Sequence, residues 1–298
     1  MTKDLATESF LILRKHFFDT EGKTIPFHLR PKGTTQDDPF DELIAKVFSG
    51  TLKGVTSHKA PGPLITPDIV LMSNRVTEIT KTQDFIAKTD LILGIEVKKL
   101  ERMANGAVAR TTGLDYNTTP PCGTIRVYLQ TGEPLDIRGY YLFVCLEPAP
   151  SAANEIVITA LVLCDGNALN ADFDYYLSIV GAREKEIGIG TYKDGVNRIR
   201  PMVIFANPLG AAVVDRQVSL IHPDENLEIS EPELKKVCIF RRTIPNEGYR
   251  NFYCYRMKND VPSDWELKLI VDPFPTPSRR TITTQARGKF RLPYRFRS

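Results

Sequence analysis

The sequence lacks the features that mark several classes of protein. Its five cysteines are widely spaced and form no Cys-x-x-Cys pair, which argues against zinc ribbons and disulfide frameworks and favours a reducing compartment. No apolar run approaches the length of a membrane span. The charged start, Met1-Thr2-Lys3-Asp4, has no signal-peptide core. We therefore expect a soluble, cytoplasmic protein without membrane partners.

Signatures of common cofactor sites and hydrolases are also missing. The four histidines are scattered, without the spacing of a zinc site or an HNH nuclease motif. Gly188-Ile189-Gly190 lacks the third glycine of a dinucleotide loop, and no Walker lysine follows it. No Gly-x-Ser-x-Gly elbow is present. These absences weaken NAD-binding, ATP-binding and serine-hydrolase interpretations.

The net charge of +3 is too small to require a polyanionic partner, but its distribution is uneven. From Pro273 onward the chain carries basic and aromatic side chains and no acidic one. The basic residues are Arg279, Arg280, Arg287, Lys289, Arg291, Arg295 and Arg297. Such a segment could follow a phosphate backbone. A solvated basic terminus is the alternative interpretation.

Two apolar segments carry the most informative residues. Pro67-Asp68 precedes the apolar run 69–72, and residues 91–98 form a second run that ends in Glu96-Val97-Lys98. Because side chains alternate along a strand, Glu96 and Lys98 share one face, roughly 7 Å apart. If the two strands are neighbours, Asp68 comes close to Glu96.

Two carboxylates beside an ammonium group suit a magnesium site. Mg²⁺ takes one or two protein carboxylates and completes its shell with water and phosphate oxygens. Such an ion neutralises a scissile phosphate, acidifies an attacking water and stabilises the leaving oxygen. Lys98 would add a fixed positive charge. This constellation predicts a nuclease.

The motif is short, so rival interpretations stay open. Glu-x-Lys occurs four times, at Glu21, Glu96, Glu233 and Glu266. The strongest rival pairs Pro223-Asp224 with Glu266-Leu267-Lys268, although the polar residues after Asp224 indicate a turn. In the remaining alternative, Glu96 and Lys98 are a solvated surface pair on a strand.

The arrangement of Pro67-Asp68 and Glu96-Val97-Lys98 resembles the PD-(D/E)XK nuclease superfamily, and within it the type II restriction endonucleases. A candidate helix at 39–48 strengthens the resemblance, because many members carry a glutamate on a helix before the aspartate strand, and Glu42 matches that place. The resemblance covers roughly residues 38–130. It implies that Asp68, Glu96, Lys98 and Glu42 are catalytic and that Asp68 and Glu96 bind Mg²⁺. It also implies double-stranded DNA as substrate, a homodimer, and a cognate DNA methyltransferase as functional counterpart.

Candidate DNA contacts follow the catalytic strand. Lys99 and Arg102 are candidates for phosphate binding, on or just after a helix that we expect to begin near Leu100. Arg110 and Asn117 are candidates for base reading, because arginine suits guanine and asparagine suits adenine. Asn117 lies in a segment, 113–123, that resembles a substrate-facing loop of restriction enzymes.

The segment pattern predicts an α/β fold with a mixed β-sheet flanked by helices, a PD-(D/E)XK core and a strand-rich C-terminal half. We expect a single elaborated domain over 1–298, with the catalytic core at about 38–165 and the basic tail at 273–298. The expected helices are 5–18, 39–48 and 172–182. The expected later strands are 140–146, 156–164, 202–205, 237–241, 249–256 and 266–271.

The leading function is thus a Mg²⁺-dependent type II restriction endonuclease. The alternatives are a structure-specific repair or recombination nuclease of the same superfamily, and a non-catalytic DNA-binding protein. The recognition sequence, the cut position and the overhang do not follow from one chain.

Overall fold

The computed structural model describes residues 4–33, 38–62, 65–76, 83–101, 123–150, 154–169, 213–214, 216–244, 247–273 and 291–293. It also describes the short strands β5 (Tyr116–Asn117), β9 (Gly190–Thr191), β10 (Asn197–Arg198), β11 (Met202–Ile204), β16 (Ser278–Thr281) and β17 (Gly288–Lys289). The expected helix at 172–182 and Cys122 lie outside these residues. Within the described part, no helix is long and apolar enough to cross a membrane.

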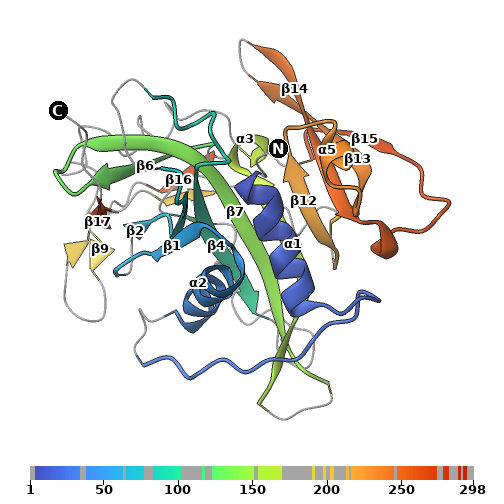
Figure 1. Ribbon diagram of the computed structural model, residues 1–298, viewed down its shortest axis with the longest axis horizontal. Helices are drawn as coiled ribbons and strands as arrows, with labels where there is room; N and C mark the ends of the chain where they lie inside the picture. The colour runs from blue at the N-terminus through green and yellow to red at the C-terminus, as the bar shows by residue number, and fades with distance from the viewer. Residues whose placement is uncertain are drawn as a thin grey trace.

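One large mixed sheet organises the fold (Figure 1). Its strands run in the order β1 (Val55–Lys59), β3 (Ile69–Ser73), β4 (Ile92–Glu101), β7 (Pro134–Pro148), β8 (Ile156–Asp165), β12 (Val218–His222), β14 (Gly248–Met257), β13 (Leu234–Ile244) and β15 (Lys268–Val271). The short strand β2 (Ile65–Thr66) pairs with β17 outside this sheet. The predicted α/β class with a mixed, strand-rich sheet is confirmed.

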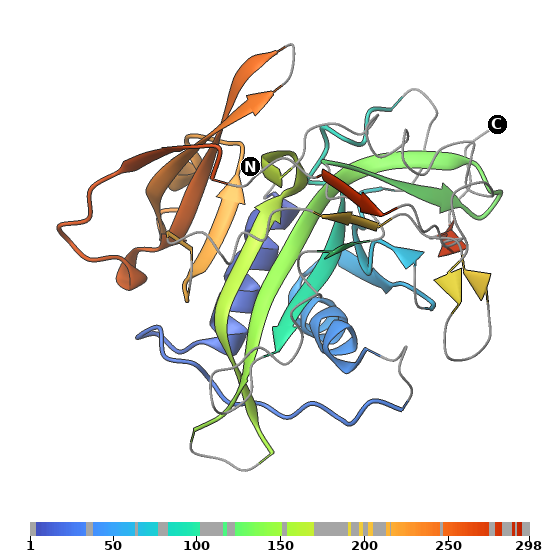
Figure 2. The same cartoon turned by 180° about the vertical axis from the view of Figure 1, so that it is seen from behind.

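Two further strands, β6 (Thr124–Leu129) and β18 (Arg291–Leu292), form a side branch of this sheet next to β7. β6 pairs with the beginning of β7, and β18 pairs with β6. Figure 2 shows β6 lying along the curved start of β7, with the long β7–β8 hairpin extending away from it.

The central strands of the sheet are covered on both faces. β3 is antiparallel to β4, whereas β4 is parallel to β7 and β8 is parallel to β12. Central strands covered on both faces need apolar side chains on both. All five residues of β3 are buried, and most of β7 is buried as well.

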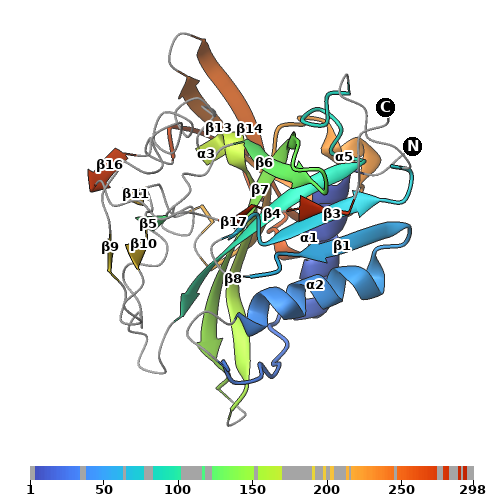
Figure 3. The same ribbon diagram turned by 90° about the vertical axis from the view of Figure 1, so that its left-hand side faces the viewer.

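Two helices cover one face of the sheet (Figure 3). α1 (Leu5–Phe17) and α2 (Pro39–Thr51) pack against each other and share one apolar core with Leu71, Leu93 and Ile95. The alternate residues Val70 and Ile92 face the opposite side, where β6 covers them. The core that includes α1 and α2 continues as far as Tyr255.

Local sequence signals explain where both helices begin. The carboxylate of Asp4 accepts a hydrogen bond from the backbone N–H of Thr7 at 2.9 Å and caps α1. Asp38 caps α2 in the same way, and Pro39 occupies its first turn, where a missing N–H is harmless.

Four of the five cysteines lie among the described residues, and none of these four forms a disulfide. Cys145, Cys164, Cys238 and Cys254 are buried free thiols. Burial raises the pKa of Cys238 to about 12 and that of Cys254 to about 11. Thiols of this kind are unreactive and pack as small apolar groups.

Candidate functional site

Asp68 lies directly before β3 and is bound to the strands on both sides. Its carboxylate accepts a hydrogen bond from the backbone N–H of Val97 in β4 at 2.7 Å. Its carbonyl oxygen accepts one from Ala60, just after β1, at 2.8 Å. The strand that carries Asp68 is therefore held against the strand that carries Glu96, as the sequence predicted.

A glycine allows this close approach. A Cβ atom on Gly94 would lie 3.3 Å from Cγ of Pro67 and 3.2 Å from Cδ1 of Ile137. The absence of a side chain at Gly94 lets Pro67 pack directly onto β4. The sequence Pro67-Asp68 and the glycine of β4 thus act together to position the carboxylate.

Glu96 and Lys98 share the face of β4 that points away from α2, as their spacing predicted. The ammonium of Lys98 donates to Oε1 of Glu96 at 2.7 Å. Glu96 is only 2% exposed, and Lys98 is mostly buried. The other carboxylate oxygen, Oε2, has no hydrogen-bond partner within the described part of the chain. A solvated surface pair would not be buried in this way.

The first turn of α2 contributes a third carboxylate, Asp41. Its pKa is raised to about 8, first by burial and then by the charges of Asp68 and Glu96, against the opposing charges of Lys98 and Lys59. These charges act strongly only over short distances inside a protein. We call Asp68, directly before β3, and Glu96 and Lys98, on the paired strand β4, together with Asp41, whose pKa responds to their charges, the acidic cluster. The direct contact of Asp41 is with Lys99.

Glu42 does not join the acidic cluster. Its carboxylate binds Arg30 at 2.7 Å and Lys46 at 2.9 Å, and these cations lower its pKa to about 2. Successive helix residues are separated by roughly 100°, so Asp41 and Glu42 point in different directions. The catalytic role of Glu42 stays a prediction, and Asp41 is the acid of the first turn of α2 on which the charges of Asp68 and Glu96 act.

The signal for Asp41 was present in the sequence. Asp41 belongs to the i, i+3, i+4, i+7 stripe with Ile44, Ala45 and Phe48, all of which are buried. An acidic residue on the apolar stripe of a helix predicts a buried carboxylate. Glu42 lies outside that stripe.

The predicted DNA contacts are only partly described. Lys99 forms ion pairs with Asp38 and Asp41, so its ammonium faces the start of α2. The expected helix near Leu100 is wrong at its start, because β4 continues through Glu101 in pairing with β7. Arg102 and Arg110 lie outside the described residues. Asn117 lies in β5, opposite Val203 of β11.

The rival motif is not assembled. Asp224 follows β12, whereas Glu266 precedes β15, and β14 and β13 lie between these strands in the sheet. Glu266 is exposed. The backbone of Asp224 is used locally, since its N–H donates to His222 and its carbonyl accepts from Tyr255.

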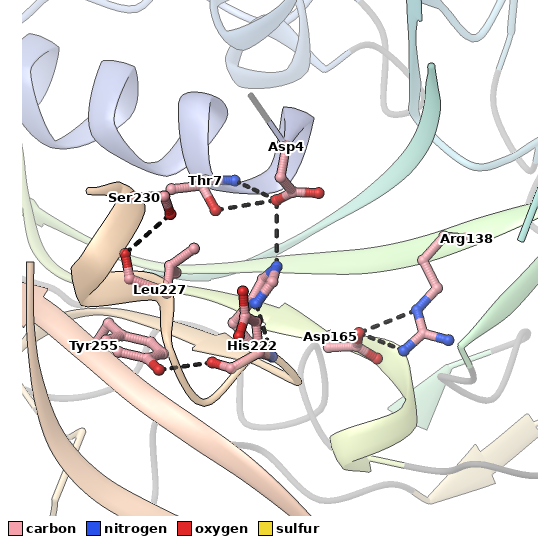
Figure 4. Close-up of polar contacts among 9 residues, drawn as sticks. Asp4, Thr7, Arg138, Asp165, His222, Leu227, Ser230 and Tyr255 are labelled. Atoms are coloured by element: carbon pink, nitrogen blue, oxygen red, sulfur yellow. Dashed lines mark hydrogen bonds and ion pairs between the residues drawn. The ribbon is translucent and has the colours of Figure 1, made fainter. Parts of the chain in front are cut away.

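A second buried polar group lies where β8 and β12 end side by side (Figure 4). Nε2 of His222 lies 3.2 Å from the Asp4 carboxylate, and its Nδ1 accepts from the backbone N–H of Asp224. Arg138 donates twice to Asp165, at 3.0 and 2.6 Å. Both ring nitrogens of His222 are thus occupied by protein groups, and the contact with Asp4 joins the start of α1 to the end of β12.

The acidic cluster is the part of the described chain with the chemistry of a cation site. No three carboxylate, imidazole or thiol groups among the described residues meet closely enough to enclose a metal ion by themselves. Mg²⁺ does not require that number, because water and phosphate complete its shell. Asp68 and Glu96 are the residues that could hold such an ion.

Comparisons with models of protein families, with curated proteins and with solved structures gave no match to this chain. The case for a function rests on the geometry of the acidic cluster.

Proposed function

We propose that this chain is a Mg²⁺-dependent endonuclease that hydrolyses phosphodiester bonds in double-stranded DNA, with a PD-(D/E)XK core built from α2, β1, β3 and β4. The observation that carries the proposal is the Glu96 carboxylate. It is almost fully buried, one oxygen is held by Lys98, and the other has no partner among the described residues. Burying an anionic oxygen without a partner is costly, so a bound ligand is the natural explanation.

Mg²⁺ fits this donor set. Asp68 and Glu96 supply hard carboxylate oxygens, and the pKa of Asp41 is raised to about 8 by burial first and by the negative charges of Asp68 and Glu96 in addition. A divalent cation would compensate these negative charges. When bound, such an ion lowers the pKa of a coordinated water and neutralises charge on the scissile phosphate.

The protein groups have separate tasks in this proposal. The Val97 N–H fixes the orientation of the Asp68 carboxylate. Lys98 holds Glu96 in place and keeps a positive charge at the point where the anionic phosphate would arrive. Lys59, exposed at the end of β1, adds positive charge on the same side, since its charge acts on Asp41.

The finer assignment rests on the resemblance of Pro67-Asp68 and Glu96-Val97-Lys98 to type II restriction endonucleases. It implies that the enzyme cuts at a short, specific DNA sequence and that it is a homodimer whose symmetry matches a symmetric sequence. It also implies a methyltransferase that protects host DNA, and action in the cytoplasm. Under this assignment Arg102, Arg110 and Asn117 remain predicted DNA contacts.

Cleavage of plasmid DNA in the presence of Mg²⁺ tests the proposal. We expect discrete fragments from the parent protein, whereas smears or nicks would favour a structure-specific repair or recombination nuclease. Asp68→Ala and Lys98→Ala should abolish cleavage while the circular dichroism spectrum and DNA binding are retained. Glu42→Gln is the matched control and should cut at the parent rate.

Thermal unfolding with and without Mg²⁺ separates a nuclease from a non-catalytic DNA-binding protein. An ion that binds the native state must raise its melting temperature. We expect a Mg²⁺-dependent rise for the parent and a smaller one for Asp68→Ala. Parent-like cleavage by both alanine variants, or no cleavage together with no effect of Mg²⁺, contradicts the proposal.

A further inference from the structure

The neighbouring strands β13 and β14 concentrate positive charge. They carry six basic side chains and no acidic one, whereas the whole chain is nearly balanced, with 39 basic and 36 acidic residues. The six basic residues are Lys235, Lys236, Arg241, Arg242, Arg250 and Arg256. Basic side chains gathered on one element attract polyanions.

One end of this strand pair projects from the sheet. β12 pairs with β14 only at residues 253–255, and β15 pairs with β13 only at residues 238–241. Within the described part of the chain, residues 242–244 and 248–251 therefore have only each other as strand partners. Figures 1 and 2 both show this end of β13 and β14 standing away from the rest of the molecule. We call residues 241–244 and 248–251 the ribbon.

One face of the ribbon is held against the body of the protein. Arg242 is 4% exposed, and its guanidinium donates to the carbonyl of Leu169 at 3.0 Å. Ile244, two positions further along β13, is buried on the same side. Because side chains alternate along a strand, Arg241 and its cross-strand partner Asn251 lie on the other face, which we call the open face.

Arg241 is held in place on the open face by neutral groups. Its Nε donates to Oδ1 of Asn251 at 3.2 Å. Its guanidinium lies over the ring of Tyr249, 5.8 Å from the ring centroid, and Tyr249 is 67% exposed. A cation fixed in this way keeps its full charge and loses little conformational entropy when it binds a ligand.

The other two arginines of the ribbon have carboxylate partners. Arg250 binds Glu247 at 2.6 Å, and Arg242 lies 3.7 Å from Asp272. No carboxylate among the described residues forms an ion pair with Arg241. Arg241 therefore offers its charge and its remaining N–H groups to a ligand from outside the chain.

We propose that the open face of the ribbon enters the major groove of duplex DNA and that Arg241 binds a guanine there. The inference rests on the proposed nuclease function, which supplies duplex DNA as the partner. A major groove is about 12 Å wide and admits a two-stranded ribbon. Arginine donates two bonds to O6 and N7 of guanine, and the terminal nitrogens of Arg241 suit this role because Asn251 already engages Nε.

A single strand fits the open face less well. Proteins bind single-stranded nucleic acids largely by stacking bases on exposed aromatic rings. Tyr249 supplies the exposed aromatic ring of this face, and the guanidinium of Arg241 already lies over that ring. The arrangement therefore favours a groove of duplex DNA over unstacked bases.

The ribbon and the acidic cluster are separate parts of the fold. Five strand spacings separate β4 from β13 in the sheet order, which is roughly 24 Å at about 4.8 Å per strand. Substitutions in the ribbon therefore leave the environment of Asp68 and Glu96 unchanged. DNA binding can be measured in EDTA without cleavage, so failure of the ribbon contact and failure of the nuclease function are distinguishable.

Selection of bound duplexes from a random-sequence DNA library, with the full chain in EDTA, tests the proposal. We expect the parent to enrich a sequence with a fixed guanine. Arg241→Ala should bind that duplex about 5- to 150-fold more weakly. Arg241→Lys keeps the charge but not the planar fork, so it should lose the preference for the guanine. Arg250→Ala is the matched control and should bind as the parent does, because Arg250 is paired with Glu247.

A change in the DNA tests the same contact without altering the protein. A guanine analogue with carbon in place of N7 should weaken binding by the parent and leave binding by Arg241→Ala unchanged. Circular dichroism checks the fold of each variant. A parent that enriches no sequence or prefers single-stranded DNA, a folded Arg241→Ala variant with parent-like affinity, or an equal effect of the analogue on both proteins overturns the proposal. The expected binding without any Mg²⁺-dependent cleavage would instead overturn the nuclease function alone.

Discussion

Replacement of Asp41 by asparagine should stabilise this protein, and increasingly so as the pH rises. Asp41 is 8% exposed, and burial together with Asp68 and Glu96 raises its pKa from 3.8 to about 8. Between these two values the folded state binds a proton that the unfolded state has released. The contribution of Asp41 to the free energy of unfolding therefore falls as the pH rises from about 4 to about 8.

The size of the effect follows from the shift. Four pKa units at about 1.4 kcal/mol per unit give an upper limit of about 6 kcal/mol at pH 8. At pH 5 the same arithmetic covers the 1.2 units between 3.8 and 5 and gives an upper limit of about 2 kcal/mol. Asparagine keeps an acceptor oxygen beside Lys99, so we expect the gain from Asp41→Asn to be larger at pH 8 than at pH 5 by up to about 4 kcal/mol.

Urea denaturation at pH 5 and pH 8, followed by circular dichroism, measures this difference. Groups that titrate equally in the parent and the variant cancel when the two are compared at each pH. Glu42→Gln is the matched control and should show no stabilisation that grows with pH, because its carboxylate is paired with cations. An Asp41→Asn variant with the same pH dependence as the parent would refute the electrostatic account of the acidic cluster.

Three further substitutions test how the fold supports the site. Arg14→Ala leaves Asp260, whose side chain is 14% exposed, without its partner 2.6 Å away, and should cost about 2–3 kcal/mol in urea unfolding. Much of this loss should be restored by adding Asp260→Asn. Gly94→Ala places a methyl group against Pro67, so we expect the free energy of unfolding to fall by about 1–3 kcal/mol and Mg²⁺ to stabilise the variant less than the parent. An unchanged response to Mg²⁺ would contradict the role of this contact. Asp4→Ala removes the cap of α1 and should lower stability by about 1 kcal/mol at neutral pH, with Asp4→Asn as the milder comparison.

Much of the sheet was predictable because its strands carry strong local signals. The apolar runs 69–72, 91–98 and 156–164 correspond to β3, β4 and β8 within a few residues. Each run is dense in β-branched and aromatic side chains, and central strands covered on both faces require that composition. Because β3 and β4 pair with each other, Asp68 and Glu96 lie close together, as the sequence predicted.

The segment after Glu96 was not predictable from local pattern. Residues 98–101 have a composition that suits a helix, yet they extend β4 because they pair with residues 143–146 of β7. This partner lies more than forty positions further along the chain, so no window around Leu100 contains the deciding contact. Tertiary pairing overrides local propensity here.

Asp41 and Glu42 are neighbouring acids, and the sequence rule alone does not choose between them as the helical carboxylate of the proposed site. Either residue fits a rule that asks only for an acid on a helix before the aspartate strand. What separates them is the direction in which the helix presents them: Asp41 lies on the stripe that packs onto the sheet, and Glu42 lies beside Arg30 and Lys46. A carboxylate on the apolar stripe loses its hydration when the helix packs. It is tolerated only where neighbouring charges or a ligand compensate for that loss. Within the proposed site, burial therefore favours Asp41 over Glu42, because a helix needs no buried acid for its own stability.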